Sequence, residues 1–136
     1  MAQLIVNADD LSYADDQTCI YSGQPFTGTA TFYRGNGSIE STVDYIDGVQ
    51  CGYVRDWNEQ GKLVMDAQVK NGAFHGLVKH YSATGKIDRE ETFEFGICTL
   101  RQELVGGDVL ATTYSLEAND PNYKVLKAMR ESLLNT

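Results

Sequence analysis

The stretch that decides the fold repeats itself between residues 28 and 99: GTATFYRGNGSIESTVDYIDGVQC (28–51), GYVRDWNEQGKLVMDAQVKNGAFH (52–75) and GLVKHYSATGKIDREETFEFGICT (76–99). Six columns of residues keep the 24-residue step, and three of these columns consist of glycine. The columns are Gly28/Gly52/Gly76, Tyr33/Trp57/Tyr81, Gly37/Gly61/Gly85, Ile39/Leu63/Ile87, Tyr45/Val69/Phe93 and Gly48/Gly72/Gly96. Periodicity of this kind indicates stacked copies of one supersecondary unit.

The glycine columns identify this unit as a β-hairpin. Gly37, Gly61 and Gly85 each end a short loop, where glycine can take the positive φ that a tight hairpin loop requires. Asp47-Gly48 and Asn71-Gly72 are dipeptides that favour the turns at the opposite end of the strands. The segments between the turns are rich in Thr, Val, Ile and aromatic residues. We therefore predict a mostly β fold: a single elongated antiparallel meander sheet of 24-residue hairpin repeats.

The ends of the chain differ from the repeats, as terminal units of repeat proteins do. Residues 1–27 are predicted to form an N-terminal cap, and residues 100–136 a degenerate hairpin followed by a C-terminal helix. Asp120 suits the N-cap of this helix and Pro121 its first position. An apolar stripe on the helix is predicted to pack on the sheet, or alternatively to dock on a partner: Val125, Leu126, Met129 and Leu133. All 136 residues then form one domain.

Strand alternation sorts the side chains of the repeats onto two faces. One face is predicted to be apolar and to form the core, with Tyr33, Trp57 and Tyr81 in its hydrophobic layer. The same face is expected to carry Ile39, Val43, Tyr45, Tyr53, Leu63, Met65, Val69, Leu77, Ile87 and Phe93. The opposite face is predicted to be acidic and solvated, and it carries Glu40, Asp44, Asp56, Asp66, Asp88 and Glu90.

The charge of the chain limits its partners. Nineteen acidic and eleven basic residues leave a formal net charge of -8. Such a surface repels nucleic acid and anionic lipid and attracts basic partners. Four aspartates precede the first basic residue, Arg34, and form either a solvated loop or part of a docking surface: Asp9, Asp10, Asp15 and Asp16. No basic leader and no apolar run of the ~20 residues that a bilayer demands is present, so a cytoplasmic protein without membrane or nucleic-acid partners is expected.

Few residues in the sequence suit a chemical site. Cys19, Cys51 and Cys98 are odd in number and widely spaced, which favours reduced, partly buried thiols. His75 and His80 have no cysteine or carboxylate pattern that completes a metal site. The serines lie outside any nucleophile-elbow context, and no glycine-rich loop precedes a helix that could hold phosphate. We predict no catalytic, cofactor-binding or metal-binding residues, and expect that the protein is not an enzyme.

The repeat pattern G-x4-Y/W-x3-G-x-I/L, followed by Asp-Gly or Asn-Gly, resembles the bacterial variant of the MORN repeat. The flanking segments Gly23-Gln24-Pro25-Phe26-Thr27-Gly28 and Leu116-Glu117-Ala118-Asn119-Asp120-Pro121-Asn122-Tyr123 resemble the entry and the closing helix of the YwqK-type antitoxin and immunity family. The likeness covers residues 11–133 and departs from the family between residues 97 and 110, where a further repeat has decayed.

This resemblance implies an immunity protein or antitoxin that binds a co-encoded bacterial toxin domain, as in contact-dependent growth inhibition. The implied partner is a basic domain, such as a nuclease, because an acidic sheet complements a cationic active-site cleft. The six carboxylates of the acidic face are the expected toxin-binding residues, and a monomer in a 1:1 complex is the expected assembly. A MORN-repeat scaffold or membrane-surface module is the alternative.

Overall fold

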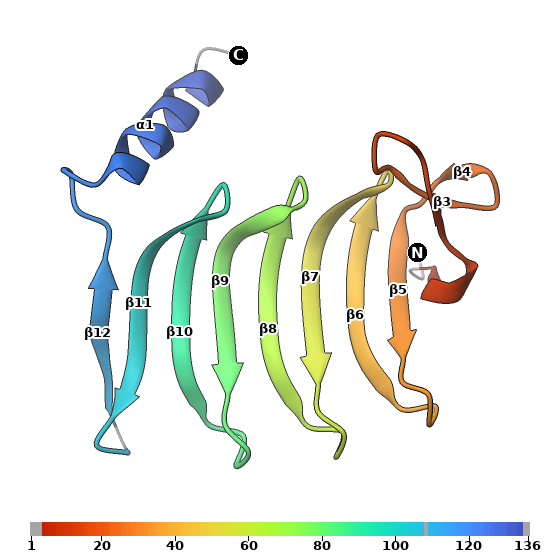
Figure 1. The fold of residues 1–136 in the computed structure, drawn as a ribbon, viewed down its shortest axis with the longest axis horizontal. Coiled ribbons are helices and arrows are strands. Elements are labelled where there is room, and N and C mark those ends of the chain that lie inside the picture. Colours follow the sequence, from red (N-terminus) through yellow and green to blue (C-terminus); the bar gives the residue numbers. More distant parts are fainter. Residues whose placement is uncertain (1–3, 108, 135–136) are drawn as a thin grey trace.

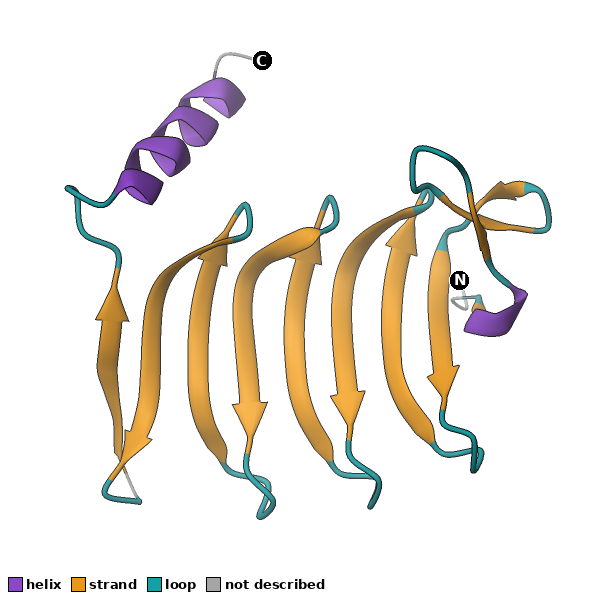
Figure 2. Cartoon of the chain, viewed as in Figure 1, coloured by secondary structure: helices purple, strands orange, loops and turns teal. Residues whose placement is uncertain are grey.

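The computed structural model describes residues 4–107 and 109–134 and shows one long, open sheet with a helix at its C-terminal end (Figures 1 and 2). Residues 1–3, 108 and 135–136 of the predicted cap, last hairpin and C-terminal segment lie outside the described residues. Within the described part, nine strands form the sheet in the order β1-β5-β6-β7-β8-β9-β10-β11-β12. Their bounds are β1 Ile5–Asn7, β5 Gly28–Tyr33, β6 Ile39–Ile46, β7 Val49–Trp57, β8 Leu63–Lys70, β9 Ala73–Tyr81, β10 Ile87–Glu94, β11 Ile97–Val105 and β12 Val109–Ser115.

The predicted meander of hairpins is confirmed. All neighbouring strands from β5 to β12 pair antiparallel, and only the short β1 joins β5 in parallel. The loop glycines have the predicted positive φ, 89° at Gly37, 80° at Gly61 and 85° at Gly85. Asp47 and Gly48 have φ values of 51° and 82°, as a two-residue hairpin turn requires. The decayed segment after residue 97 forms the last hairpin, β11–β12.

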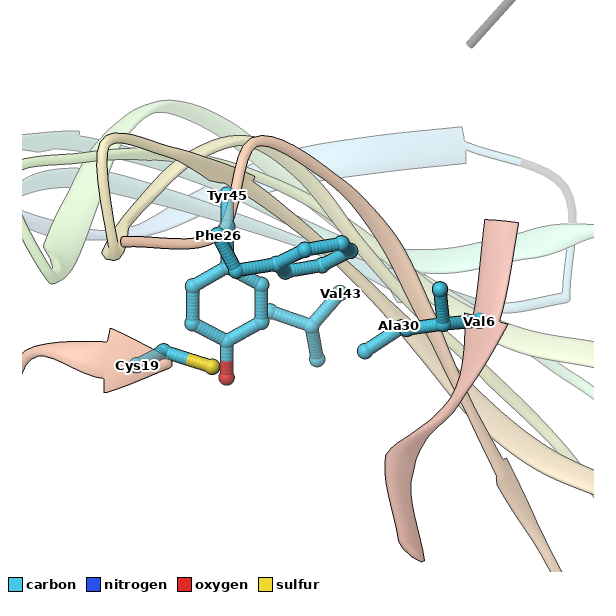
Figure 3. Packing of buried hydrophobic residues seen from close by; sticks show 6 residues of the cluster. All are labelled: Val6, Cys19, Phe26, Ala30, Val43 and Tyr45. Atoms are coloured by element: carbon cyan, nitrogen blue, oxygen red, sulfur yellow. The ribbon is translucent and has the colours of Figure 1, made fainter. Parts of the chain in front are cut away.

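The N-terminal cap covers the first strands of the sheet and contains the hydrophobic core. It comprises β1, the 3-10 helix η1 (Ala8–Asp10) and a small three-stranded sheet of β2 (Ser12–Tyr13), β3 (Cys19–Tyr21) and β4 (Gln24–Pro25). The core cluster consists of Val6, Cys19, Phe26, Ala30, Val43 and Tyr45 (Figure 3). Phe26 lies at its centre, 2% exposed, with its ring centroid 5.8 Å from that of Tyr21 and 5.7 Å from that of Tyr45.

The core continues along one face of the sheet as a row of small apolar side chains. Strand pairing aligns Ala30, Val43, Val54, Ala67 and Val78 across five strands, from β5 to β9. Ala67 is fully buried and Val78 is 1% exposed. We call this side of the sheet the valine face.

The predicted division of side chains between the two faces is wrong in part, because bulges interrupt the strand alternation twice in each repeat. The first bulge leaves Glu40, Val64 or Asp88 as the extra residue of its hairpin, again at a step of 24 residues. The second bulge lies between Val43 and Tyr45 and again between Ala67 and Val69. An extra residue reverses the side on which the following side chains lie. Tyr53 and Leu77, predicted in the core, therefore lie on the opposite face.

The aromatic column is also less buried than predicted. Tyr33 is 49% exposed, and Ile39 and Tyr53 are 41% and 40% exposed, so these three do not belong to a core. Trp57 and Tyr81 are half-buried. Tyr33 and Trp57 directly follow Phe32 and Asp56, which lie on the valine face, so strand alternation places this column on the opposite face, away from the N-terminal cap. Val43, Tyr45 and Val69 are buried, as predicted.

The C-terminal helix α1 (Pro121–Leu134) begins where the sequence predicts. The backbone N–H of Asn122 donates to Oδ1 of Asp120 at 2.9 Å, which confirms Asp120 as the N-cap. The predicted packing of the apolar stripe is wrong for most of its members, since Leu126 is 1% exposed but Val125, Met129 and Leu133 are 49%, 39% and 59% exposed. Figure 1 shows the reason: α1 lies beyond the strand ends and not over a face of the sheet.

Within residues 4–107 and 109–134, no helix has the length and apolar character needed to cross a bilayer. The three cysteines are free, as predicted; Cys19 is buried, and Cys51 and Cys98 are half-buried.

Candidate protein-binding surface

The six carboxylates predicted to form one acidic face do not lie together. Strand pairing places Asp44, Asp66 and Glu90 on the face opposite to the valine face, whereas Asp56 pairs with Met65 on the valine face. Glu40 and Asp88 are bulge residues at the loop end of the sheet. The prediction that strand alternation places all six carboxylates on one face is therefore wrong.

On the opposite face, the predicted acidic residues belong to a balanced row of charges. Successive strand pairs align Arg55, Asp66, Lys79 and Glu90 across β7, β8, β9 and β10. We call this side the ladder face. Arg55 Nε lies 3.3 Å from Asp66 Oδ1. Opposite charges alternate along the row and neutralise one another, so this face does not present the negative potential expected of it.

Asp44 stabilises the second bulge of the first repeat. Its carboxylate accepts hydrogen bonds from the backbone N–H of Tyr53 at 3.0 Å and from the hydroxyl of Thr29 at 2.7 Å. Gln68, 24 residues later, accepts from the backbone N–H of Leu77 at 2.7 Å in the same way. These side chains fill the space beside Gly52 and Gly76, where a Cβ atom would collide with them, which explains glycine at these two positions; at Gly28 a Cβ atom would collide with the backbone of Leu4 and the ring of Phe26.

Two of the predicted carboxylates, Asp56 on β7 and Asp88 on β10, line one groove at the loop end of the valine face. A straight row of cross-strand neighbours runs along it: Asp56, Met65, His80, Arg89 and Glu103. Asp88 joins them, with Val64, Tyr81 and Leu104 completing the walls of a cavity of about 630 Å³. We call this cavity the carboxylate groove, after Asp56, Asp88 and Glu103.

The acidic side of the groove is electrostatically unfavourable in the isolated protein. Burial raises the pKa of Asp56, and the nearby carboxylate of Glu40 raises it further, against the opposing effect of Arg34. Glu40 itself pairs with Arg34, whose Nη1 lies 3.5 Å from Glu40 Oε2. A cationic side chain from a partner would stabilise the ionised form of Asp56 and offset both effects.

A buried ionic cluster next to the groove was not predicted. Glu91 is 7% exposed, and its carboxylate lies 2.9 Å from Arg101 Nε, 3.1 Å from His80 Nε2 and 3.6 Å from Arg89 Nε. Burial raises the pKa of Glu91, but the hydrogen bonds from Arg101 and His80 and the two guanidinium charges outweigh it, so the pKa lies below its ordinary value. The cluster joins β9, β10 and β11 in one network.

A signal for this cluster is present in the repeat alignment. Glu91 occupies the column of Val43 and Ala67, which is apolar in the other two repeats. A carboxylate in a core column requires partners. His80 stands in the column of Phe32 and Asp56, whose chemistry differs in every repeat, so the alignment alone does not distinguish it from a surface residue. His80 instead lies between Glu91 and the carboxylate groove.

The N-terminal aspartates lie on the surface of the cap. Asp9 and Asp10 belong to η1, and Asp15 and Asp16 to the turn before β3; all four are exposed. The side chain and backbone of Thr18 donate hydrogen bonds to Asp16 and lower its pKa. Within the described residues, no group of three or more His, Cys, Asp or Glu side chains has a metal-binding arrangement.

Comparisons with protein-family models, with curated proteins and with solved structures found no match to this chain.

Proposed function

We propose that this chain is an immunity protein or antitoxin that binds a co-encoded bacterial toxin domain and covers its basic active-site cleft. The observation that carries the proposal is the carboxylate groove, which places Asp56, Asp88 and Glu103 in one open cavity across the middle strands of the sheet. Such a groove accepts a protruding basic segment rather than a small enclosed substrate. The resemblance of residues 11–133 to the YwqK-type family supports the same function.

The distribution of charge along the chain supports a basic partner. Residues 1–51 contain seven acidic residues and a single basic one, Arg34. The acidic segment 1–51 and the groove therefore attract a cationic domain from a distance, and this steering raises the association rate. A nuclease-type toxin of a contact-dependent inhibition or polymorphic toxin system has the required basic cleft. In this proposal each chain binds one toxin in the cytoplasm and acts without catalysis or a cofactor.

A titration of neutralisation tests the proposed function. The toxin-like domain encoded next to this chain would be purified, and its activity measured while this protein is added in known amounts. A stoichiometric inhibitor abolishes the activity near one chain per toxin, whereas an enzyme that modifies the toxin would do so at a small fraction of that ratio. Activity that persists in excess of the protein would contradict the proposal. Binding to anionic vesicles instead of the toxin would favour the membrane-surface alternative.

Charge removal in the groove is expected to slow toxin binding. The double variant Asp56→Asn with Asp88→Asn should lower the association rate about fivefold or more at low salt, because two charges that steer the partner are lost. Its thermal stability should be unchanged or slightly higher, since Asp56 is partly buried near another carboxylate.

The matched control is Asp66→Asn with Glu90→Gln on the ladder face, which removes the same number of charges from a balanced row. Its association rate should stay within about twofold of wild type at low salt. Stopped-flow measurements at low and physiological ionic strength distinguish the two surfaces. Equal slowing by both double variants would show that net charge, and not the groove, steers the partner.

A further inference from the structure

The C-terminal edge of the sheet is an open strand. β12 is the last strand of the sheet, and the described residues pair it only with β11. The backbone N–H and C=O groups on its outer side are therefore free to pair with another strand. The opposite edge differs, because β1 has three residues and leads directly into η1 and the cap.

The sequence of β12 contains no charged residue and no proline to protect it as an edge strand, and its one irregularity is the bulge at Thr113. Val109–Ser115 reads VLATTYS, without a charged residue or a proline. Thr112 and Thr113 are exposed, and Val109 is 63% exposed. Natural edge strands of this length usually carry a lysine, a proline or a cover from another element.

The C-terminal helix does not cover this edge. Arg130 Nε donates to Glu94 Oε1 at 3.0 Å, and Glu94 is the last residue of β10, two strands inward. The hydrogen bond from Arg130 lowers the pKa of Glu94, as expected of a formed ion pair. Figure 1 shows α1 rising from β12 and running back toward β10, so the outer side of β12 stays open.

The charge distribution favours a second copy of the chain as the partner that pairs with the open edge of β12. Residues 100–136 contain five acidic and four basic residues, whereas residues 1–51 contain seven acidic residues and one basic residue. Two acidic chains can therefore approach with little repulsion at β12. A continuous sheet of two copies would place the acidic caps at opposite ends, ~80 Å apart at ~4.8 Å per strand, far beyond the screening length of ~8 Å.

We propose that two copies of this chain pair β12 with β12 in antiparallel orientation and form a two-fold symmetric dimer with one continuous sheet. Antiparallel pairing of identical strands makes the interface self-complementary and closed, which prevents growth into a fibre. Thr112 and Thr113 lie near the middle of the contact, where cross-strand pairs of β-branched residues are favourable. This dimer replaces the monomer expected from the sequence and leaves both carboxylate grooves available. The inference does not depend on the proposed function.

Sedimentation equilibrium of the full chain tests the dimer. The apparent mass should rise from 15.1 kDa toward twice that value between about 1 and 300 µM, the range in which a small interface associates. Thr112→Lys places like charges opposite each other at the two-fold axis and should weaken dimerisation at least tenfold. Thr113 is a bulge residue of β12 and has no partner residue on β11. Thr113→Pro removes its backbone N–H donor and should also weaken dimerisation at least tenfold.

Ile5→Lys is the matched control, because Ile5 is 68% exposed on the opposite edge strand. It should dimerise as wild type does. Far-UV circular dichroism verifies that each variant is folded, and Thr112→Lys keeps the test valid if the proline variant does not fold. A wild-type chain that stays monomeric over this range overturns the proposal. So does a dimer that Thr112→Lys leaves unchanged or that Ile5→Lys disrupts.

Discussion

Replacing Gly48 with alanine should lower the free energy of unfolding by about 3 kcal/mol, because the new methyl group meets the N-terminal cap. Gly48 has a φ of 82°, and a Cβ atom there would overlap Thr18 Cγ2 and lie 2.8 Å from the carbonyl oxygen of Cys19. The same turn holds the cap through two backbone hydrogen bonds of 2.8 Å, from Gly48 N–H to Phe26 O and from Cys19 N–H to Gly48 O. The substitution therefore disturbs both the turn and the core beneath the cap.

Gly72→Ala is the control for backbone strain alone. Gly72 occupies the same repeat column with a φ of 80°, and a Cβ atom there would have nothing within 4 Å. Its substitution should cost about 1 kcal/mol, the usual penalty for alanine in the left-handed region. Equilibrium denaturation of both variants measures the difference. Equal losses of unfolding free energy would mean that the cap accommodates the new methyl group without destabilising the protein, and that the cap does not stabilise the turn.

Neutralising Glu91 should cost about 2 kcal/mol at neutral pH. Glu91→Gln keeps the shape of the side chain but leaves the guanidinium groups of Arg89 and Arg101 together beside His80 without a compensating charge. Removing one partner of a buried ion pair is destabilising, but Arg89 and Arg101 are 42% and 37% exposed, so water compensates part of their charge. Glu90→Gln is the control on the adjacent residue, which lies on the ladder face, and should cost less than about 1 kcal/mol. Urea denaturation of the two variants compares them, and similar losses would contradict a special role of the cluster.

The effect of Glu91 should disappear in acid. Its pKa is lowered in the folded protein relative to the ordinary value of 4.5, so its contribution is complete above that value. The contribution is lost as the pH falls through the folded pKa, because the carboxyl group becomes protonated in both states. The difference in unfolding free energy between wild type and Glu91→Gln should therefore shrink below pH 4.5. A difference that stays constant down to pH 3 would show that packing, and not charge, accounts for the loss.

The candidate site was predictable only in part from the sequence. Asp56 and Asp88 were predicted as binding residues, and in the structure both line the carboxylate groove. Glu103, the third carboxylate, belongs to the decayed hairpin, where no repeat column guides the alignment. Asp66 and Glu90 were assigned to an acidic surface, but in the sheet they pair with the basic residues Arg55 and Lys79. Alternation along one strand does not reveal which residue of the next strand lies opposite.

The sequence by itself determined the hairpin, its 24-residue period and the position of each turn. These features depend on local backbone conformation: glycine at positive φ in the loops, Asp-Gly and Asn-Gly in the turns, and Asp120-Pro121 at the start of the helix. Such preferences act within a few residues of the chain, so they can be recognised from the sequence without knowledge of the tertiary structure.

Only the tertiary structure decided which side chains share a face and which are buried. A bulge shifts the register between two strands by one residue, and this shift exchanges the faces for every following side chain. Burial likewise depends on what covers the sheet. The N-terminal cap buries Val43 and Tyr45, whereas Tyr33 is 49% exposed because the bulge in β6 places it on the opposite face from them, away from the cap.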